Sequence, residues 1–387
     1  MSVSSLSAEE KLYNLPCFAG FVYCLVSNPI EPGVLAVGGG DGAVRVWRTG
    51  DTSDMFSVRL VTIRQSKVMS LAWHPTKEGL LAAGTDDGKV AWVEVVNSSR
   101  QPSVSSYQHR AGVYCLAWLS SKALLSCGDG KIVQHDINTG KGQELNLGSS
   151  QGKSQVVLVD RGDFQLLLVG YEDGSIQVFL HPSLTLLVNI KSQSKLIQSL
   201  ALHPQYLSDG SQAEYSEYLA SASNEFPVHI FDLAQIVKGA AESEVATEVL
   251  VTPTLSLAGH LQRVIELAWA PHDSRLLCSV SYDWSAQVGP LYSRHHYHYH
   301  NSHQVWDVST GAPLHNFSGH CGRVMSCLWH PTRPGLVITG SEDTTLHIWD
   351  PKVGLMCPVV RFVRSRIISG SATTVTRREE KREEDKI

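Results

Sequence analysis

The chain has 387 residues and a formal net charge of −5 at pH 7, with 43% hydrophobic and 18% charged residues. This composition is typical of a packed globular protein and excludes a disordered chain, while the acidic balance argues against non-specific nucleic-acid binding over the whole surface. The N-terminal residues lack the apolar core of a signal peptide, and no apolar run approaches the roughly 18 residues of a membrane span, so we expect a soluble, intracellular protein without membrane contact.

The eight cysteines form no Cys-x-x-Cys pair of the kind that holds a metal ion. Three of them, Cys24, Cys115 and Cys327, lie in apolar runs at similar positions. They are therefore predicted to be buried thiols of a protein in a reducing compartment.

A pattern of about 40 residues recurs seven times along the chain. Each copy has two apolar strands, a tight turn and a third strand that often ends in Trp-Asp, and the clearest copies cover residues 67–95 and 323–350. Gly-His stands before a strand at His260 and His320, which together with the period is typical of WD40 repeats. Because one copy is too small to bury its own apolar face, the copies must pack around a ring. The sequence therefore predicts an all-β fold, a seven-bladed WD40 β-propeller.

The elements follow one another regularly in chain order. The first strands of the blades are predicted at 22–26, 68–73, 113–118, 156–159, 196–202, 264–269 and 324–329, and the second strands at 34–38, 80–84, 124–127, 166–170, 218–222, 276–280 and 336–340. Asp-Gly turns, which support the positive φ of a tight hairpin, follow at Asp41, Asp87, Asp129 and Asp173. The third strands are predicted to end at Trp47, Val93, His135, Phe179, Phe231, Trp306 and Trp349.

The repeats assign residues 15–363 to one propeller, between an N-terminal segment (1–14) and a mixed-charge tail (364–387) that is predicted to be disordered. A polar loop is expected at 204–217 and a short helix within 234–253. Blade seven needs an outer strand from residues 12–18 or 359–363, and we favour the N-terminal one as a closing clasp.

Residues 288–304 (VGPLYSRHHYHYHNSHQ) interrupt the third strand of the sixth copy. Without them the sequence reads SYDWSAQ and then VWDVSTG, which is an intact blade. The segment starts with Val and ends with Gln, as the translation of an intron running from GT to CAG would, so we interpret it as a retained intron or a gene-model error. The alternative is metal capture by its histidines, but the segment offers no Cys or carboxylate partner, so we expect no metal site. These histidines are His295, His296, His298, His300 and His303.

No catalytic motif is present: the sequence lacks a G-x-S-x-G elbow, a P-loop and an H-E-x-x-H pair. His260 with Asp283, and His320 with Asp343, are instead predicted to form hydrogen-bond networks with the Trp of the third strand inside their blades. We therefore expect a binding protein rather than an enzyme, with no cofactor and no small-molecule substrate.

The residues immediately before each first strand are expected to line one rim of the central channel. Aligning the copies places Phe21, Lys67, Gly112, Lys195, Arg263 and Arg323 there, while the fourth copy aligns poorly; Tyr114 lies two places further along in the third copy. Cations that track phosphates and rings that stack on bases, at about 1–3 kcal/mol per base, suit a single-stranded nucleic acid. The alternative is that these are solvated loop charges.

The repeats also resemble a known family. The runs SKVMSLAWHPTKEGLLAAGTDDGKV (66–90), GFVYCL (20–25), VYCLAW (113–118) and LAGHLQRVIELAWAP (257–271) are similar to the fifth Gemin subunit of the SMN complex, and the similarity extends from about residue 15 to 350. That family has two fused propellers followed by helical and dimerisation regions. This chain resembles only the second propeller, so we expect it to be a fragment or a truncated gene model.

The resemblance implies recognition of the Sm site and the 7-methylguanosine cap of snRNA precursors, for spliceosomal snRNP assembly. It implies a base-stacking role for Phe21, a cap-pocket role for Tyr114, and a contact at Arg263, where the family typically has Lys; the two cations are not interchangeable. Implied partners are snRNA and other subunits of the SMN complex, and the implied location is the cytoplasm and nucleus, including nucleoplasm and gem bodies. With half of the site missing, weaker RNA binding is expected. The alternative function is a protein-interaction scaffold whose rim grips a peptide.

Overall fold

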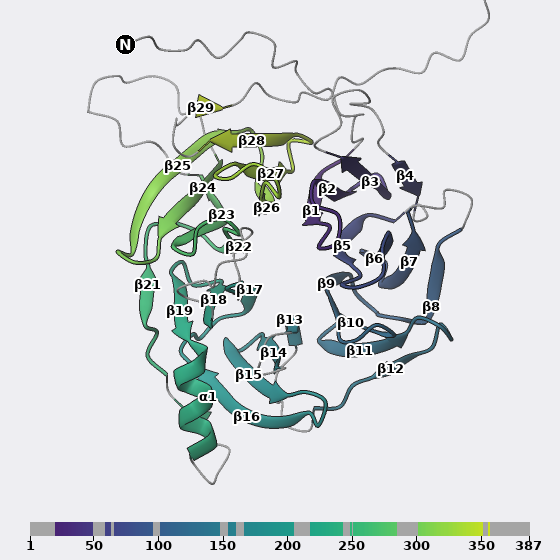
Figure 1. Cartoon of the computed structure of the whole chain (residues 1–387), viewed down its shortest axis with the longest axis horizontal. Helices are drawn as coiled ribbons and strands as arrows, with labels where there is room; N and C mark the ends of the chain where they lie inside the picture. The colour runs from purple at the N-terminus through teal and green to yellow at the C-terminus, as the bar shows by residue number, and fades with distance from the viewer. Residues whose placement is uncertain are drawn as a thin grey trace, which may run out of the picture.

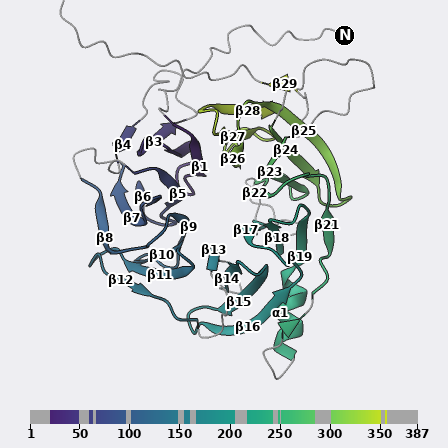
Figure 2. The same cartoon turned by 180° about the vertical axis from the view of Figure 1, so that it is seen from behind.

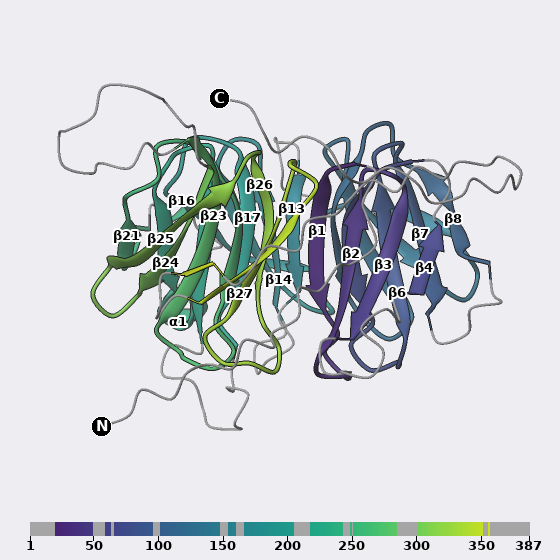
Figure 3. The same ribbon diagram turned by 90° about the horizontal axis from the view of Figure 1, so that it is seen from above.

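The computed structural model describes residues 20–48, 59–62, 66–95, 101–147, 154–159, 166–204, 217–242, 248–249, 251–284, 301–350 and 355–356. These residues form seven sheets, each built on antiparallel blade strands and arranged in a ring, which confirms the predicted propeller (Figure 1; Figure 2). Seen from the side, the strands of each blade run between two faces of a short cylinder (Figure 3).

The strands follow the predicted order within each blade. Blade one contains β1 (Val22–Ser27), β2 (Val34–Gly39), β3 (Ala43–Arg48) and β4 (Arg59–Thr62). Blade two contains β5 (Val68–Trp73), β6 (Leu80–Thr85), β7 (Lys89–Glu94) and β8 (Ser103–Gln108). Blade three contains β9 (Val113–Trp118), β10 (Ala123–Gly128), β11 (Lys131–Asp136) and β12 (Gly142–Glu144). Blade four contains β13 (Ser154–Val159), β14 (Leu166–Tyr171), β15 (Ser175–Leu180) and β16 (Thr185–Lys191).

The remaining blades follow the same plan. Blade five contains β17 (Ile197–Leu202), β18 (Tyr218–Ser223), β19 (Val228–Asp232) and β21 (Leu255–Leu257). Blade six contains β22 (Val264–Trp269), β23 (Leu276–Trp284), β24 (Asn301–Asp307) and β25 (Ala312–His320). Blade seven contains β26 (Val324–Trp329), β27 (Val337–Ser341), β28 (Leu346–Asp350) and β29 (Leu355–Met356).

The core lies between neighbouring sheets. The second strands β2, β6, β10 and β14 are buried at every residue, which is why they read as short continuous apolar runs. The Trp that ends a first strand joins two blades, because its indole N–H donates to a carbonyl of the preceding first strand. Trp73 donates to Val26 over 3.3 Å, and Trp329 donates to Ala268 over 2.8 Å. These bonds fix the stacking of one blade on the next.

The ring closes between blades seven and one. Val22 and Leu25 pack in one apolar cluster with Leu328 and Ile338. The outer position beside β28 is filled by β29, whose Met356 pairs with Trp349. The two segments predicted for this position, residues 12–18 and 359–363, both lie outside the described residues, so the N-terminal clasp stays a prediction.

Blade four carries a fifth strand, β20 (Glu248–Val249), which pairs in parallel with β16 and which the repeats did not predict. The expected helix is present as α1 (Leu233–Glu242), whose Leu233, Ile236 and Val237 pack into the core between blades four and five. In Figure 1 this helix lies on the outside of the ring. No helix in the described part of the chain has both the length and the apolar composition that crossing a membrane needs.

The predicted insertion in blade six overlaps the sheet. β23 ends at Trp284 and β24 begins at Asn301, where the two residues pair; residues 285–300 lie outside the described part. The last four residues of the predicted insertion therefore belong to β24, and Gln304 pairs with Ser279. Residue 287, directly before the predicted insertion, and residue 304, its last residue, are both Gln. Either of them can therefore stand before Val305 in the third strand. The segments 1–14 and 364–387 lie outside the described residues.

Candidate nucleic-acid interface

The first strands of the blades enclose a channel with a cavity of about 620 Å³. The second residue of each first strand faces this cavity, in six blades as Tyr23, Met69, Tyr114, Gln198, Ile265 and Met325. These six side chains are aromatic, aliphatic, thioether or amide, and none of them is an acid or a base, so this part of the channel wall is amphipathic and not charged.

The predicted rim residues are paired with a second row of residues that follow the second strands. In each case the backbone N–H of the second-row residue donates to the carbonyl of the rim residue: Gly40 to Phe21 over 2.8 Å, Asp86 to Lys67 over 3.0 Å, Tyr282 to Arg263 over 3.1 Å, and Glu342 to Arg323 over 3.0 Å. This row was not predicted from the sequence. Its signal was available, because each member stands directly before the Asp of its turn, as Tyr282 stands before Asp283.

The structure corrects the position of Lys195. In blade five the second-row residue Asn224 donates to the carbonyl of Leu196, over 3.0 Å, so Leu196 and not Lys195 occupies the rim position. The predicted first strand began one residue too early: Ile197 pairs with Ser223 as Val68 pairs with Thr85 in blade two. Lys195 is exposed one residue before the rim.

The two predicted aromatic residues are both exposed at the mouth, Phe21 by 42% and Tyr114 by 59%. The ring of Phe21 contacts Tyr23 edge-on, with 5.9 Å between centroids. A Cβ at Gly112 would lie only 3.1 Å from Cζ of Tyr114, so the Tyr114 ring lies over the rim position that Gly112 leaves free. Because residue 112 has no side chain, the ring of Tyr114, which belongs to the channel-facing row, can extend over the rim.

The two predicted arginines meet on one tyrosine that the sequence analysis did not identify. The Cζ atom of Arg263 lies 4.1 Å from the ring centroid of Tyr282, and that of Arg323 lies 4.8 Å from it. Tyr282 therefore holds two cations from neighbouring blades close together by cation–π attraction. Guanidinium groups in such a pair can contact phosphate or stack on a base.

Carboxylates moderate the charge of the rim. The Lys67 ammonium lies 3.8 Å from the Asp86 carboxylate, and the Arg323 guanidinium lies 3.4 Å from that of Glu342. Burial raises the pKa of the Tyr23 hydroxyl, and the charges of Glu342 and Asp86 raise it further. The rim thus contains two cation–carboxylate pairs, so its charge is mixed and not uniformly basic.

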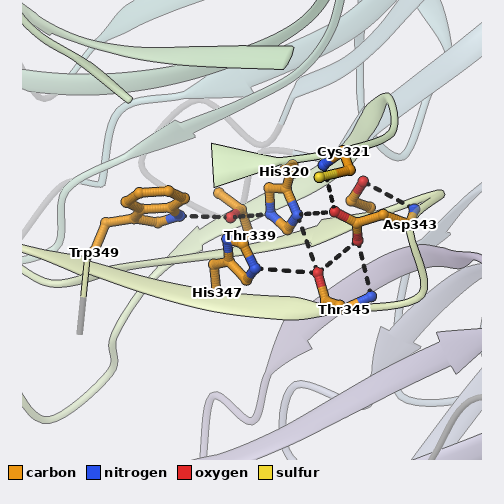
Figure 4. A network of polar contacts seen from close by, with 8 residues as sticks. His320, Cys321, Thr339, Asp343, Thr345, His347 and Trp349 are labelled. Carbon is orange, nitrogen blue, oxygen red and sulfur yellow. Dashed lines mark hydrogen bonds and ion pairs between the residues drawn. The ribbon is translucent and has the colours of Figure 1, made fainter. Parts of the chain in front are cut away.

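The histidine–aspartate pairs are structural, as predicted. Figure 4 shows the network of blade seven: His320 Nδ1 lies 2.9 Å from Asp343, His320 Nε2 lies 2.8 Å from the Thr339 hydroxyl, and the Trp349 indole N–H donates to Thr339 over 2.8 Å. Burial alone would raise the pKa of Asp343, but hydrogen bonds, chiefly with His320, hold that pKa below its ordinary value.

Blade six repeats this arrangement with His260, Asp283, Ser279 and Trp306. Blade three contains a variant that the sequence analysis missed, in which Ser126 hydrogen-bonds both His109 and His135. The network links the loop before a blade, its second strand and its third strand, and so stabilises the blade.

The network of blade seven could alternatively be a metal site, since ligand atoms of His320, Asp343 and His347 lie within 4.8 Å of one another. Both ring nitrogens of His320 already have hydrogen-bond partners in blade seven, Asp343 and Thr339. The same pattern in blade six, with His260 bonded to Asp283 and Ser279, favours the structural role.

The chain is similar over most of its length to a known family. The family model described as RIG second beta-propeller matches residues 29–342. Gem-associated protein 5 of Homo sapiens is 33% identical over 369 residues, which are 89% of this chain and 23% of that protein, and Gem-associated protein 5 of Mus musculus gives the same values. The WD repeat-containing protein WDS homolog of Arabidopsis thaliana is 22% identical over 324 residues, 82% of this chain and 53% of that protein. These matches confirm the resemblance found in the repeats.

Proposed function

We propose that this chain, which belongs to the RIG second beta-propeller family, is a non-catalytic module that binds single-stranded RNA at the mouth of its channel. The observation that carries the proposal is the convergence of Phe21, Tyr114 and the Arg263–Tyr282–Arg323 group on one mouth. Exposed rings offer stacking surfaces for bases, and the paired guanidinium groups offer contacts to phosphate.

The finer proposal names the RNA. Because the chain is 33% identical to Gem-associated protein 5, we propose precursors of spliceosomal snRNA as its ligand, recognised through the Sm site and the 7-methylguanosine cap. Phe21 and Tyr114 would stack on bases, and Arg263 would contact the cap or its phosphates. We propose other SMN-complex subunits as partners, and the cytoplasm and nucleus as the location. The chain spans 23% of the length of these relatives.

A peptide-binding scaffold is the competing function, and the mixed charge of the rim favours it more than a plainly basic rim would. The pairs Lys67–Asp86 and Arg323–Glu342 could exchange partners with a peptide of either charge. The two functions differ in their response to loss of an exposed ring, because base stacking depends on the aromatic face.

The test is fluorescence-anisotropy binding of the chain to a capped snRNA oligonucleotide with a uridine run, beside an uncapped one and one with the uridines replaced. RNA recognition predicts binding that depends on the cap or the uridines and that Phe21→Ala and Tyr114→Ala each weaken by about 1–3 kcal/mol. Binding that ignores both RNA features rejects recognition of the cap and the Sm site. Absent binding, or binding that both variants retain, rejects the mouth as an RNA site and leaves the peptide scaffold.

A further inference from the structure

Blade five presents an exposed ring on the same face as the rim. Phe226 lies in the turn between β18 and β19 and is 46% exposed, although it is a large aromatic residue. The corresponding turns of blades one to four carry Asp-Gly, so this turn departs from the repeat. Single apolar residues are common on protein surfaces, so the residues beside this ring decide whether it belongs to a binding site.

Hydrogen bonds fix the backbone beside Phe226. The Glu225 N–H donates to the Ser223 hydroxyl over 3.0 Å, and the Glu225 carboxylate accepts the Ser194 N–H over 2.9 Å as well as the Ser194 hydroxyl. The Glu225 carboxylate is thereby engaged, and Phe226 projects from an anchored turn. A turn whose backbone is already fixed loses little conformational entropy when a base stacks on the ring that it carries.

The same hydrogen bonds place a cation beside the ring. Lys195 follows Ser194 directly, and Phe226 follows Glu225, so the Ser194–Glu225 contact brings Lys195 and Phe226 to adjacent segments. Among the described residues, no carboxylate lies within ion-pair distance of the Lys195 ammonium, whereas Lys67 and Arg323 have such partners. Lys195 is thus an exposed cation with its charge available to a ligand.

A second apolar residue stands nearby on the next loop. Leu261 is 65% exposed, and its backbone N–H is held by the Asp283 carboxylate over 3.1 Å. β19 pairs with β21 through Val228 and Leu257, so Phe226 and Leu261 both lie beyond the same end of this strand pair. Leu261 also stands two residues before Arg263, which connects this group with the rim.

We propose that Lys195, Phe226 and Leu261 form an outer subsite, where single-stranded RNA leaving the channel mouth stacks one base on Phe226 beside Leu261 and places a phosphate at Lys195. This inference rests on the proposed RNA-binding function and extends its site outward over blades five and six. An aromatic ring with an adjacent unpaired cation fits a nucleotide, whose base and phosphate are joined in one unit. In this subsite Lys195 contacts phosphate although it lies one residue before the rim position.

The test uses the whole chain and two labelled uridine-rich RNAs, one of about four nucleotides and one of about twelve, both within the roughly 4–16 nucleotides that single-strand-binding domains cover. Phe226→Ala is expected to weaken binding of the longer RNA by roughly 5- to 150-fold, the loss of one stacked base, and to leave the shorter RNA unaffected. Ile30→Ala is the matched control, because Ile30 is an exposed apolar residue on the opposite face. Unchanged thermal unfolding of Phe226→Ala shows that the blade is intact.

Lys195→Ala provides an independent readout. Loss of one phosphate contact should lower the slope of log affinity against log salt by about 0.7 for the longer RNA, which a merely structural role would not do. Lys122→Ala, an exposed lysine in the loop between β9 and β10 on the opposite face, is the control and should keep the wild-type slope.

The outcomes distinguish failure of RNA binding at the rim from failure of the outer subsite. If neither RNA binds the wild-type chain, the proposed function fails and the outer subsite fails with it. If Phe21→Ala weakens binding while Phe226→Ala and Lys195→Ala leave the longer RNA unaffected, the rim function stands and the outer subsite is rejected. The same result is expected if the patch serves a protein partner. Equal losses on both RNAs reject the outer subsite as well.

Discussion

Tyr114 reaches the rim because Gly112 lacks a side chain: a Cβ at residue 112 would lie 3.1 Å from Cζ of Tyr114 and 3.2 Å from its hydroxyl oxygen. Both atoms belong to the tip of the ring. A side chain at residue 112 would therefore move the ring and leave the strand intact. The pair explains why blade three has a glycine where blades two, six and seven have Lys67, Arg263 and Arg323.

Gly112→Ala should therefore displace the Tyr114 ring and weaken RNA binding by up to the roughly 1–3 kcal/mol of one stacked base. Anisotropy titration measures the loss, and Gly112→Ala combined with Tyr114→Ala should bind no more weakly than Tyr114→Ala alone. The matched control is Gly239→Ala in α1, where nothing lies within 4 Å of the added Cβ. It should leave RNA binding unchanged and stabilise the fold by about 0.5–1 kcal/mol. Wild-type affinity of Gly112→Ala would contradict the positioning role.

Glu342→Gln should strengthen RNA binding. The Glu342 carboxylate lies 3.4 Å from the Arg323 guanidinium and competes with phosphate for it, so removal of the negative charge releases a cation at the mouth. We expect a several-fold gain in affinity and a salt slope that is steeper by about 0.7, measured by anisotropy at several salt concentrations. Glu31→Gln is the control, because Glu31 pairs with Arg48 over 3.3 Å on the opposite face. A weaker complex for Glu342→Gln would show that the carboxylate itself contacts the ligand.

Asp283→Ala should destabilise blade six. Asp283 is buried, lies 2.6 Å from His260 Nδ1 and also accepts the Leu261 N–H, so its removal leaves buried donors without a partner at a cost of roughly 1–3 kcal/mol. Denaturant unfolding measures this cost. Asp273→Ala is the comparison, since its ion pair with Arg275 is solvent-exposed and should contribute about 1 kcal/mol or less. Equal effects of the two substitutions would contradict a structural role for the network.

Glu266 should make stability depend on pH. It lies in the channel wall and accepts the Cys327 N–H over 2.8 Å; burial raises its pKa from 4.5 to about 7, although contacts with Ser326 and Cys327 act in the opposite direction. Because the folded protein holds this proton more tightly than the unfolded chain, the stabilisation is complete below about pH 4.5 and is lost as pH rises to about 7.

Glu266→Gln keeps a carbonyl acceptor for Cys327 and cannot ionise, so its free energy of unfolding should fall less than that of the wild type over this pH range. Glu78→Gln, which changes an exposed carboxyl on the opposite face, is the control for the background pH dependence. Chemical unfolding at several pH values measures both. Parallel profiles for Glu266→Gln and the wild type would show that this carboxyl does not titrate differently in the folded state.

The sequence by itself determined the blades. The strands of blade two, from Val68 to Glu94, lie where the apolar runs and the Asp-Gly turn predicted them, because alternation, burial on both sheet faces and positive φ are properties of a few consecutive residues. The internal networks were predictable for the same reason: His320 and Asp343 recur at a fixed separation within one repeat.

Only the tertiary structure decided what meets at the mouth. Tyr282 and Arg323 belong to different blades, and their contact depends on how two sheets stack, which no single repeat encodes. The alignment of the repeats placed Lys195 at the rim of blade five. The hydrogen bond from the Asn224 N–H to the Leu196 carbonyl shows that Leu196 occupies that position. The outer strand of blade seven was also undetermined, since β29 has two residues and several short apolar runs compete for such an edge. The repeats specify each blade, whereas the packing between blades specifies the site.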